Sequence, residues 1–191
     1  VGVVTNIGPA HLEFLGSMDN VARAKGELLE SMQGRGTAVL NADDPYFDML
    51  RASFPGRTVA FSIAGRADVR ATDIRQRREV TDLSLHARGH AVPVLLGTVG
   101  RHNIANALAA AAAATALDVP LETVKAGLER FQPVSMRSEI REVKGRTILA
   151  DCYNANPSSV HAALETLVAL GATRTVAVLG DMLELGGAGV E

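Results

Sequence analysis

The hydrophobic pattern at the start of the chain predicts a buried strand ending at Val4 and an amphipathic helix from about Asp19 to Met32. One face of this helix carries four residues at spacings of four, three and four: Val21, Lys25, Leu28 and Met32. An ammonium group on an apolar face is costly unless it is paired or chemically altered. From the pattern alone, the simpler interpretation of Lys25 is a lysine whose stem packs while its head reaches water.

The pattern over the next sixty residues alternates between strand and helix and then changes. A short strand begins at Thr37, and the polar residues at 41–45 that close it are interpreted as turn formers. A helix is predicted over 46–53 and a strand over 58–62, an alternation that indicates a largely parallel α/β sheet. Three short apolar runs over 68–97 predict an antiparallel meander added to that sheet.

Two helices and a break in the pattern follow the meander. The longer helix is predicted to run to about Leu117, with Asn103 as its N-cap. The next helix begins at Pro120, a residue that suits the first helical turn, and ends near Phe131. Residues 132–137 break the pattern and are interpreted as a linker between two domains.

After the linker the pattern predicts a βαβ unit with a right-handed crossover. Its strands are 147–151 and 175–181, and its helix starts at Asn156 and Pro157 and ends near Leu170. Ligands of such sheets bind beyond the carboxyl ends of the strands, which is where Asp151 and Asp181 lie. The turn has no Gly-x-Gly-x-x-Gly motif, so the unit does not carry the dinucleotide-binding fingerprint.

Composition narrows the class of protein. A hydrophobic fraction of 47% and a charged fraction of 21% are typical of a globular protein, and a net charge of −2 gives no electrostatic case for nucleic acid or an anionic membrane. The single cysteine, Cys152, rules out an internal disulfide and suits a reducing cytosol, so a cytoplasmic protein is expected. Because Val1 stands inside a predicted strand, we expect the chain to be a fragment.

The residues around the first turn resemble the central domain of the Mur ligases, which extend the peptide of the cell-wall precursor at the expense of ATP. The resemblance lies in Thr5-Asn6-Ile7-Gly8, Ala10-His11-Leu12-Glu13, Gly16-Ser17 and Ala24-Lys25-Gly26-Glu27. It implies that His11 binds a Mg²⁺ ion and that Lys25 is carbamylated and supports the same metal site as a catalytic residue. A carbamate beside Mg²⁺ is a paired anion, which removes the difficulty of an ammonium on the apolar face.

Three further positions match residues that hold ATP in the Mur ligases. The run Gly100-Arg101-His102-Asn103-Ile104-Ala105-Asn106-Ala107-Leu108 matches the family's signature. This implies that Asn106 reads adenine, whose N6/N7 edge an asparagine amide can bind with two hydrogen bonds. By the same resemblance, Arg137 lies at the hinge near the phosphates and ribose, and Asp151 binds the ribose. The sequence departs from the family at Ser135, where glycine is frequent, and at Ser138, where an apolar residue is common.

Two late motifs are similar to the branch of the family that joins D-alanyl-D-alanine to UDP-N-acetylmuramoyl-tripeptide: Asp151-Cys152-Tyr153-Asn154-Ala155-Asn156-Pro157 and Gly180-Asp181-Met182-Leu183-Glu184-Leu185-Gly186. The resemblance implies that ATP phosphorylates the tripeptide carboxylate and that the dipeptide amine attacks the acyl phosphate. Two Mg²⁺ ions would screen the charges that meet. We expect a monomer with no nucleic-acid or membrane partner.

The expected organisation is the C-terminal part of an ATP-binding central domain over 1–134 and the first part of a C-terminal domain over 135–191. The sequence has no Gly-x-x-x-x-Gly-Lys-Ser/Thr phosphate loop, which is expected upstream together with a domain for the UDP-sugar. We therefore expect this chain alone to be inactive. Two alternatives remain: another amide ligase of the same superfamily, of the folylpolyglutamate or cyanophycin type, and a non-catalytic α/β binding module.

Overall fold

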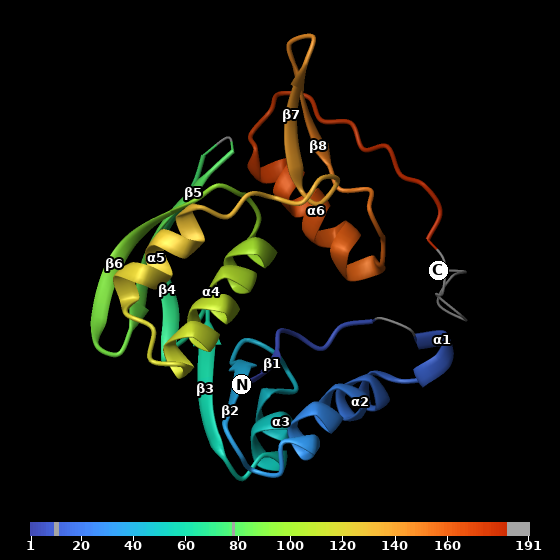
Figure 1. Ribbon diagram of the computed structural model, residues 1–191. Helices are drawn as coiled ribbons and strands as arrows, with labels where there is room; N and C mark the ends of the chain where they lie inside the picture. Colours follow the sequence, from blue (N-terminus) through green and yellow to red (C-terminus); the bar gives the residue numbers. More distant parts are fainter. Residues whose placement is uncertain (10–11, 78, 183–191) are drawn as a thin grey trace.

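The computed structural model describes residues 1–9, 12–77 and 79–182, and these residues form an α/β fold built on one large sheet (Figure 1). The sheet order is β1 (Gly2–Val4), β2 (Thr37–Asn41), β3 (Arg57–Ser62), β4 (Val69–Gln76), β5 (Thr81–Ala87) and β6 (His90–Leu96). Strands β1 to β4 pair in parallel, whereas β4, β5 and β6 form an antiparallel meander. The predicted fold class is therefore confirmed.

Alternation along β2 explains why helices cover both faces of the parallel part. Ala38 and Leu40 pack with α2 (Met18–Ser31) and α3 (Phe47–Ser53) in one buried cluster. Val39 points to the other face and joins a cluster with α4 (Arg101–Ala116) and α5 (Leu121–Glu129). The alanine-rich α4 lies across β2, β3 and β4, and its small side chains permit this close packing (Figure 1).

The buried face of α2 differs from the predicted one. Leu28 is 43% exposed and Lys25 is half-buried, while the buried residues of this helix are Val21, Ala22, Gly26 and Leu29. Gly26 faces α3, and an added methyl group there would lie 3.7 Å from Leu50 Cδ2, an ordinary van der Waals contact. A hydrophobic pattern misses this contact because glycine does not count as apolar.

The start of α4 also differs from the prediction. Gly100 is the N-cap, with a φ of 93° that L side chains rarely adopt. Asn103 lies inside the first turn, where its Nδ2 donates to Thr98 Oγ1 at 2.9 Å and to the Val99 carbonyl at 2.8 Å. Asn103 was thus wrongly predicted as the cap, and its side chain instead holds the loop that leads into the helix.

Beyond the linker, an antiparallel hairpin of β7 (Glu139–Val143) and β8 (Arg146–Ala150) precedes α6 (Pro157–Ala169) (Figure 1). Lys144 and Gly145 form its two-residue turn with φ angles of 50° and 73°, as in the type I′ turns that suit hairpins. β7 was not predicted, because residues 139–143 hold three charged side chains and no continuous apolar run. Asn156 caps α6 as predicted, with Oδ1 accepting from Ser159 N at 2.8 Å.

The predicted strand over 175–181 is wrong. These residues form no strand, and Val178 is 93% exposed. A strand of a parallel sheet is normally covered on both faces, whereas Val176 and Leu179 are 67% and 66% exposed here. The predicted crossover therefore does not form, although Asp151 does follow a strand, β8. No helix within the described ranges is both long and apolar enough to span a membrane.

Candidate functional site

The loop after β1 is held at the carboxyl edge of the parallel sheet by polar side chains from other elements. Lys25 Nζ donates to the Asn6 carbonyl at 2.8 Å. Asn41 Nδ2 donates to the Thr5 carbonyl at 3.0 Å, and Ile7 N donates to Asp44 Oδ2 at 2.6 Å. Lys25 therefore reaches across from α2 to the edge where ligands of such sheets bind.

The carboxylates near this loop already accept hydrogen bonds from N–H and hydroxyl groups of the chain. Asp44 accepts from Ile7 N and, through its other oxygen, from Tyr46 N at 2.8 Å. Asp43 binds Ser62 Oγ at 2.5 Å and Ile63 N at 2.6 Å, and so closes the loop after β3. The interpretation of residues 41–45 as structural turn formers agrees with these contacts.

This arrangement bears on the predicted magnesium site. Within the described ranges no group of three His, Cys, Asp or Glu side chains is placed to hold a metal ion. Mg²⁺ prefers charged oxygen ligands. Since the aspartates of this loop are engaged by N–H groups, the donor set fits Mg²⁺ only if Lys25 carries the predicted carbamate. His11 lies outside the described residues, so its pairing with Lys25 remains a prediction.

Asn106 lies one turn into α4 and is exposed. It borders an apolar cavity of about 550 Å³ between α4 and α5. Polar groups on the wall of this cavity come from Thr98, Asn103 and Thr123. A hydrophobic cavity with a few amide and hydroxyl groups is typical of a small-molecule site. Its other lining residues are Leu96, Ala107, Ala110, Ala114, Val119, Val124, Gly127, Leu128 and Phe131.

Three contacts connect the region of Arg137 to the region of Asp151. The Arg137 guanidinium stacks on the Tyr153 ring, 4.2 Å from its centroid. Ser138 N donates to Asp151 Oδ1 at 2.8 Å, and Tyr153 N donates to the Met136 carbonyl at 3.2 Å. Arg137 and Asp151 are thus brought together at the hinge, whereas Lys25 and Asn106 lie in separate surroundings.

His102 connects this hinge to the start of α4. Its Nε2 lies 3.0 Å from Ser138 Oγ. Burial lowers the pKa of the His102 imidazole, and the negative charge of Asp151 opposes this effect only in part. The imidazole is consequently neutral near pH 7. Sequence reasoning missed Tyr153 as the partner of Arg137, although an aromatic residue two positions after Asp151 was a usable signal.

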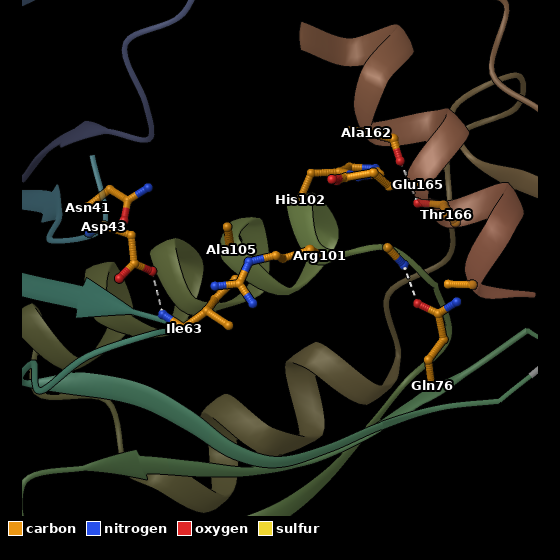
Figure 2. A pocket seen from close by; sticks show the side chains of 12 residues that line it. Asn41, Asp43, Ile63, Gln76, Arg101, His102, Ala105, Ala162, Glu165 and Thr166 are labelled. Carbon is orange, nitrogen blue, oxygen red and sulfur yellow. Dashed lines mark hydrogen bonds between the residues drawn. The ribbon is translucent and has the colours of Figure 1, made fainter. Parts of the chain in front are cut away.

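A second cavity, of about 360 Å³, separates α4 from α6 (Figure 2). Arg101 and His102 from α4 and Glu165 and Thr166 from α6 border it. Gln76 closes one end and accepts a hydrogen bond from Gly100 N through Oε1 at 3.1 Å, drawn as a dashed line in Figure 2. The predicted site residues that the structure describes, Lys25, Asn106, Arg137 and Asp151, do not line this cavity.

Both parts of the chain are similar to known proteins. Residues 1–114 match the Mur ligase middle domain, and residues 136–189 match the Mur ligase glutamate ligase domain. UDP-N-acetylmuramoyl-tripeptide–D-alanyl-D-alanine ligase of Escherichia coli (strain K12) is 40% identical over 187 residues, covering 96% of this chain and 41% of that protein. The ligase of the same name from Bacillus subtilis (strain 168) is 33% identical, covering 96% of this chain and 40% of that protein.

Solved structures agree with these sequence matches. Crystal structure I of MurF from Acinetobacter baumannii has a TM-score of 0.92 at 33% identity and covers 98% of this chain and 41% of that chain. MurF from Thermotoga maritima in complex with ADP has a TM-score of 0.86 at 28% identity, and the match covers 98% of this chain and 43% of that chain. A folylpolyglutamate-synthase mutant from L. casei, at 17% identity and a TM-score of 0.67, shares the fold alone. The chain spans about two fifths of the length of the curated relatives named above.

Proposed function

This chain belongs to the Mur ligase family, and from that premise we propose that the protein containing it joins D-alanyl-D-alanine to UDP-N-acetylmuramoyl-tripeptide with consumption of ATP. The observation that carries the proposal is 40% identity over 96% of the chain to an Escherichia coli protein named for this reaction. Both late motifs quoted from the sequence point to the same branch. The reaction belongs to peptidoglycan synthesis, and we place it in the cytoplasm.

Asn106, Arg137 and Asp151 are proposed to hold the nucleotide. The apolar cavity beside Asn106 suits an adenine ring, whose N6/N7 edge the asparagine amide would bind. Asp151 keeps its Oδ2 free of hydrogen-bond donors from the described residues, since the Ser138 N–H binds Oδ1. That free oxygen is suited to a ribose hydroxyl. The positive charge of Arg137 is suited to the phosphates.

Lys25 and His11 are proposed to act at the other end of the nucleotide. A carbamate on Lys25 and the imidazole of His11 would hold Mg²⁺, which supplies positive charge to screen the phosphate and carboxylate oxygens. Asn41 keeps the loop after β1 in place for this purpose through its 3.0 Å hydrogen bond to the Thr5 carbonyl. In the unmodified state, Lys25 instead donates to the Asn6 carbonyl.

The chemical sequence follows from the identity of the substrates. The terminal carboxylate of the tripeptide attacks the γ-phosphorus of ATP, releasing ADP and leaving an acyl phosphate. The amine of D-alanyl-D-alanine then attacks the acyl carbon, phosphate leaves with its bonding electrons, and the amine loses a proton. Closure of the linker at Arg137 would bring nucleotide and acceptor together and exclude water from the acyl phosphate.

An acceptor panel tests this function on the full-length product of the gene that encodes the chain. ADP release is measured with UDP-N-acetylmuramoyl-tripeptide and D-alanyl-D-alanine, and separately with folate and glutamate or with a cyanophycin primer and its amino acids. We expect ADP release only when the tripeptide and the dipeptide are both present. Release with another pair would reassign the enzyme within the superfamily, and release with none would favour a binding module.

A further inference from the structure

Three segments that are distant in sequence meet at the first turn of α4. Gly100 lies so close to its neighbours that an added methyl group would be 2.7 Å from His102 Cε1 and 2.8 Å from Thr166 Oγ1. Thr166 is 3% exposed and belongs to α6, beyond the linker. His102 and Thr166 border the same cavity, from α4 and α6, in Figure 2. The glycine at position 100 therefore permits direct contact between the two parts of the chain.

Ser138, the first residue after the linker, fastens this contact. It is 4% exposed and has a φ of 49°, a left-handed conformation that is unfavourable for a residue with a Cβ atom. Such a conformation persists where the surroundings over-determine it. Here the backbone N–H binds Asp151 at 2.8 Å, while the hydroxyl binds His102 at 3.0 Å.

These two bonds link the start of α4 to the carboxylate proposed to hold the ribose. The Ser138 N–H fixes one oxygen of Asp151 and so fixes the direction of the other. The His102 ring, in turn, fixes the Ser138 hydroxyl and the turn of the linker. An apolar side chain at position 138 would leave the His102 Nε2 without this partner.

We propose that His102 and Ser138 are positioning residues, which hold the linker against α4 and thereby orient Asp151 toward the nucleotide. This inference rests on the proposed nucleotide role of Asp151. The two residues touch neither substrate nor the reacting atoms. Their effect is on the affinity for nucleotide and on the coupling between residues 1–131 and 139–170.

Matched variants of the full-length protein test the nucleotide part of the proposal. Ser138→Ala removes the hydroxyl, and Ser138→Gly also removes it while relieving the positive φ. His102→Leu removes the ring nitrogen, whereas His102→Gln keeps an amide nitrogen near the position of Nε2. We expect the KM for ATP to rise about 3- to 10-fold in the first three variants, as for the loss of one hydrogen bond, with kcat unchanged and with recovery in His102→Gln.

Nitrogen-15 relaxation of this chain tests the mechanical part without nucleotide. In the wild type we expect residues 1–131 and 139–170 to share one rotational correlation time. In Ser138→Ala and His102→Leu we expect each of these two parts to have its own, shorter correlation time. Wild-type KM values in Ser138→Ala and His102→Leu, together with one correlation time, would overturn the proposal. A lower kcat at constant KM would do so too, because it indicates a smaller folded fraction. A wild-type protein that binds no ATP would instead overturn the proposed function.

Discussion

Asn106 is an exposed amide beside an apolar cavity, and its neighbour Asn103 has a different task. Asn103 is occupied by Thr98 and Val99, whereas the described residues give the Asn106 side chain no hydrogen bond. A polar group at the edge of a hydrophobic cavity is suited to choose between ligands of similar shape. The two asparagines thus form a natural pair of test and control.

Replacing Asn106 by alanine should weaken ADP binding and reduce the preference for ADP over GDP. A bidentate amide contact to adenine is worth about 1–3 kcal/mol of discrimination, or about 5- to 150-fold. Isothermal titration of the full-length protein with both nucleotides measures the effect. Asn103→Ala should lower the melting temperature while leaving the ratio of the two affinities unchanged. An unaltered ratio in Asn106→Ala would remove this residue from the nucleotide site.

Lys25 contributes either an ammonium or a carbamate, and substitutions separate the two. If the carbamate acts, Lys25→Met should reduce ligase activity at least about 100-fold, as for lost electrostatic stabilisation of developing charge. Lys25→Glu, which restores a carboxylate at shorter reach, should retain more activity than Lys25→Met and should respond to added Mg²⁺. Lys125→Met, on the distant helix α5, is the control. Equal loss in both Lys25 variants would argue for an ammonium role.

The lowered pKa of His102 makes the folded state sensitive to acid. The unfolded chain takes up a proton near the ordinary histidine pKa of 6.5, while the folded chain takes it up only at lower pH. The contribution of this residue to stability is therefore fully present above pH 6.5 and is lost as pH falls through the folded pKa. Between pH 7.5 and 5.5, the melting temperature should fall more in the wild type than in His102→Gln. His90→Gln, at an exposed position of β6, is the control, and its melting temperature should fall by as much as that of the wild type.

Among the elements, α6 has the clearest local signal. Asn156 accepts from Ser159 N, and the Ser159 hydroxyl accepts in turn from Asn156 N at 3.0 Å. Asn156→Ala should destabilise the chain by about 0.5–2 kcal/mol in urea denaturation followed by circular dichroism. Asn154→Ala, in the exposed loop before the helix, should change stability by less than about 0.5 kcal/mol. Equal effects of the two substitutions would show that the cap is dispensable.

Elements with local signals were predictable from sequence, and elements that depend on distant partners were not. The run from Thr37 to Asn41 and the capped helix α6 carry their own pattern and were predicted nearly to the residue. The apolar run at 175–181 has the composition of a strand, but a parallel strand also requires neighbours that cover it. β7 was missed because Glu139–Val143 carries no continuous apolar run, and its strand conformation depends on pairing with β8 across the turn.

The same distinction applies to the candidate site. Motif resemblance supplied Lys25, Asn106, Arg137 and Asp151, but spacing cannot show which side chains share a pocket. The link from His102 through Ser138 to Asp151 spans more than thirty residues of sequence and depends on the path of the linker. The stacking of Arg137 on Tyr153 likewise follows from the turn between them.

At the scale of the whole molecule, the residues proposed to bind nucleotide lie on both sides of the linker, while the sequence has no phosphate-loop motif. We therefore expect the 191-residue chain alone to form no ADP when given ATP, tripeptide and dipeptide. The full-length product is the positive control under the same conditions. ADP formation by the chain alone at a rate comparable to that of the control would show that the phosphate loop is not required.

The most direct test of the account is a titration of this chain with ADP, followed by ¹H–¹⁵N spectra, which detect weak binding. The central claim is that one nucleotide contacts residues before and after the linker. We predict that the Asn106 side-chain amide and the backbone amides of Ser138 and Tyr153 shift together along one binding curve. Shifts confined to one side of the linker, or to the Figure 2 cavity around Arg101 and Glu165, would contradict it.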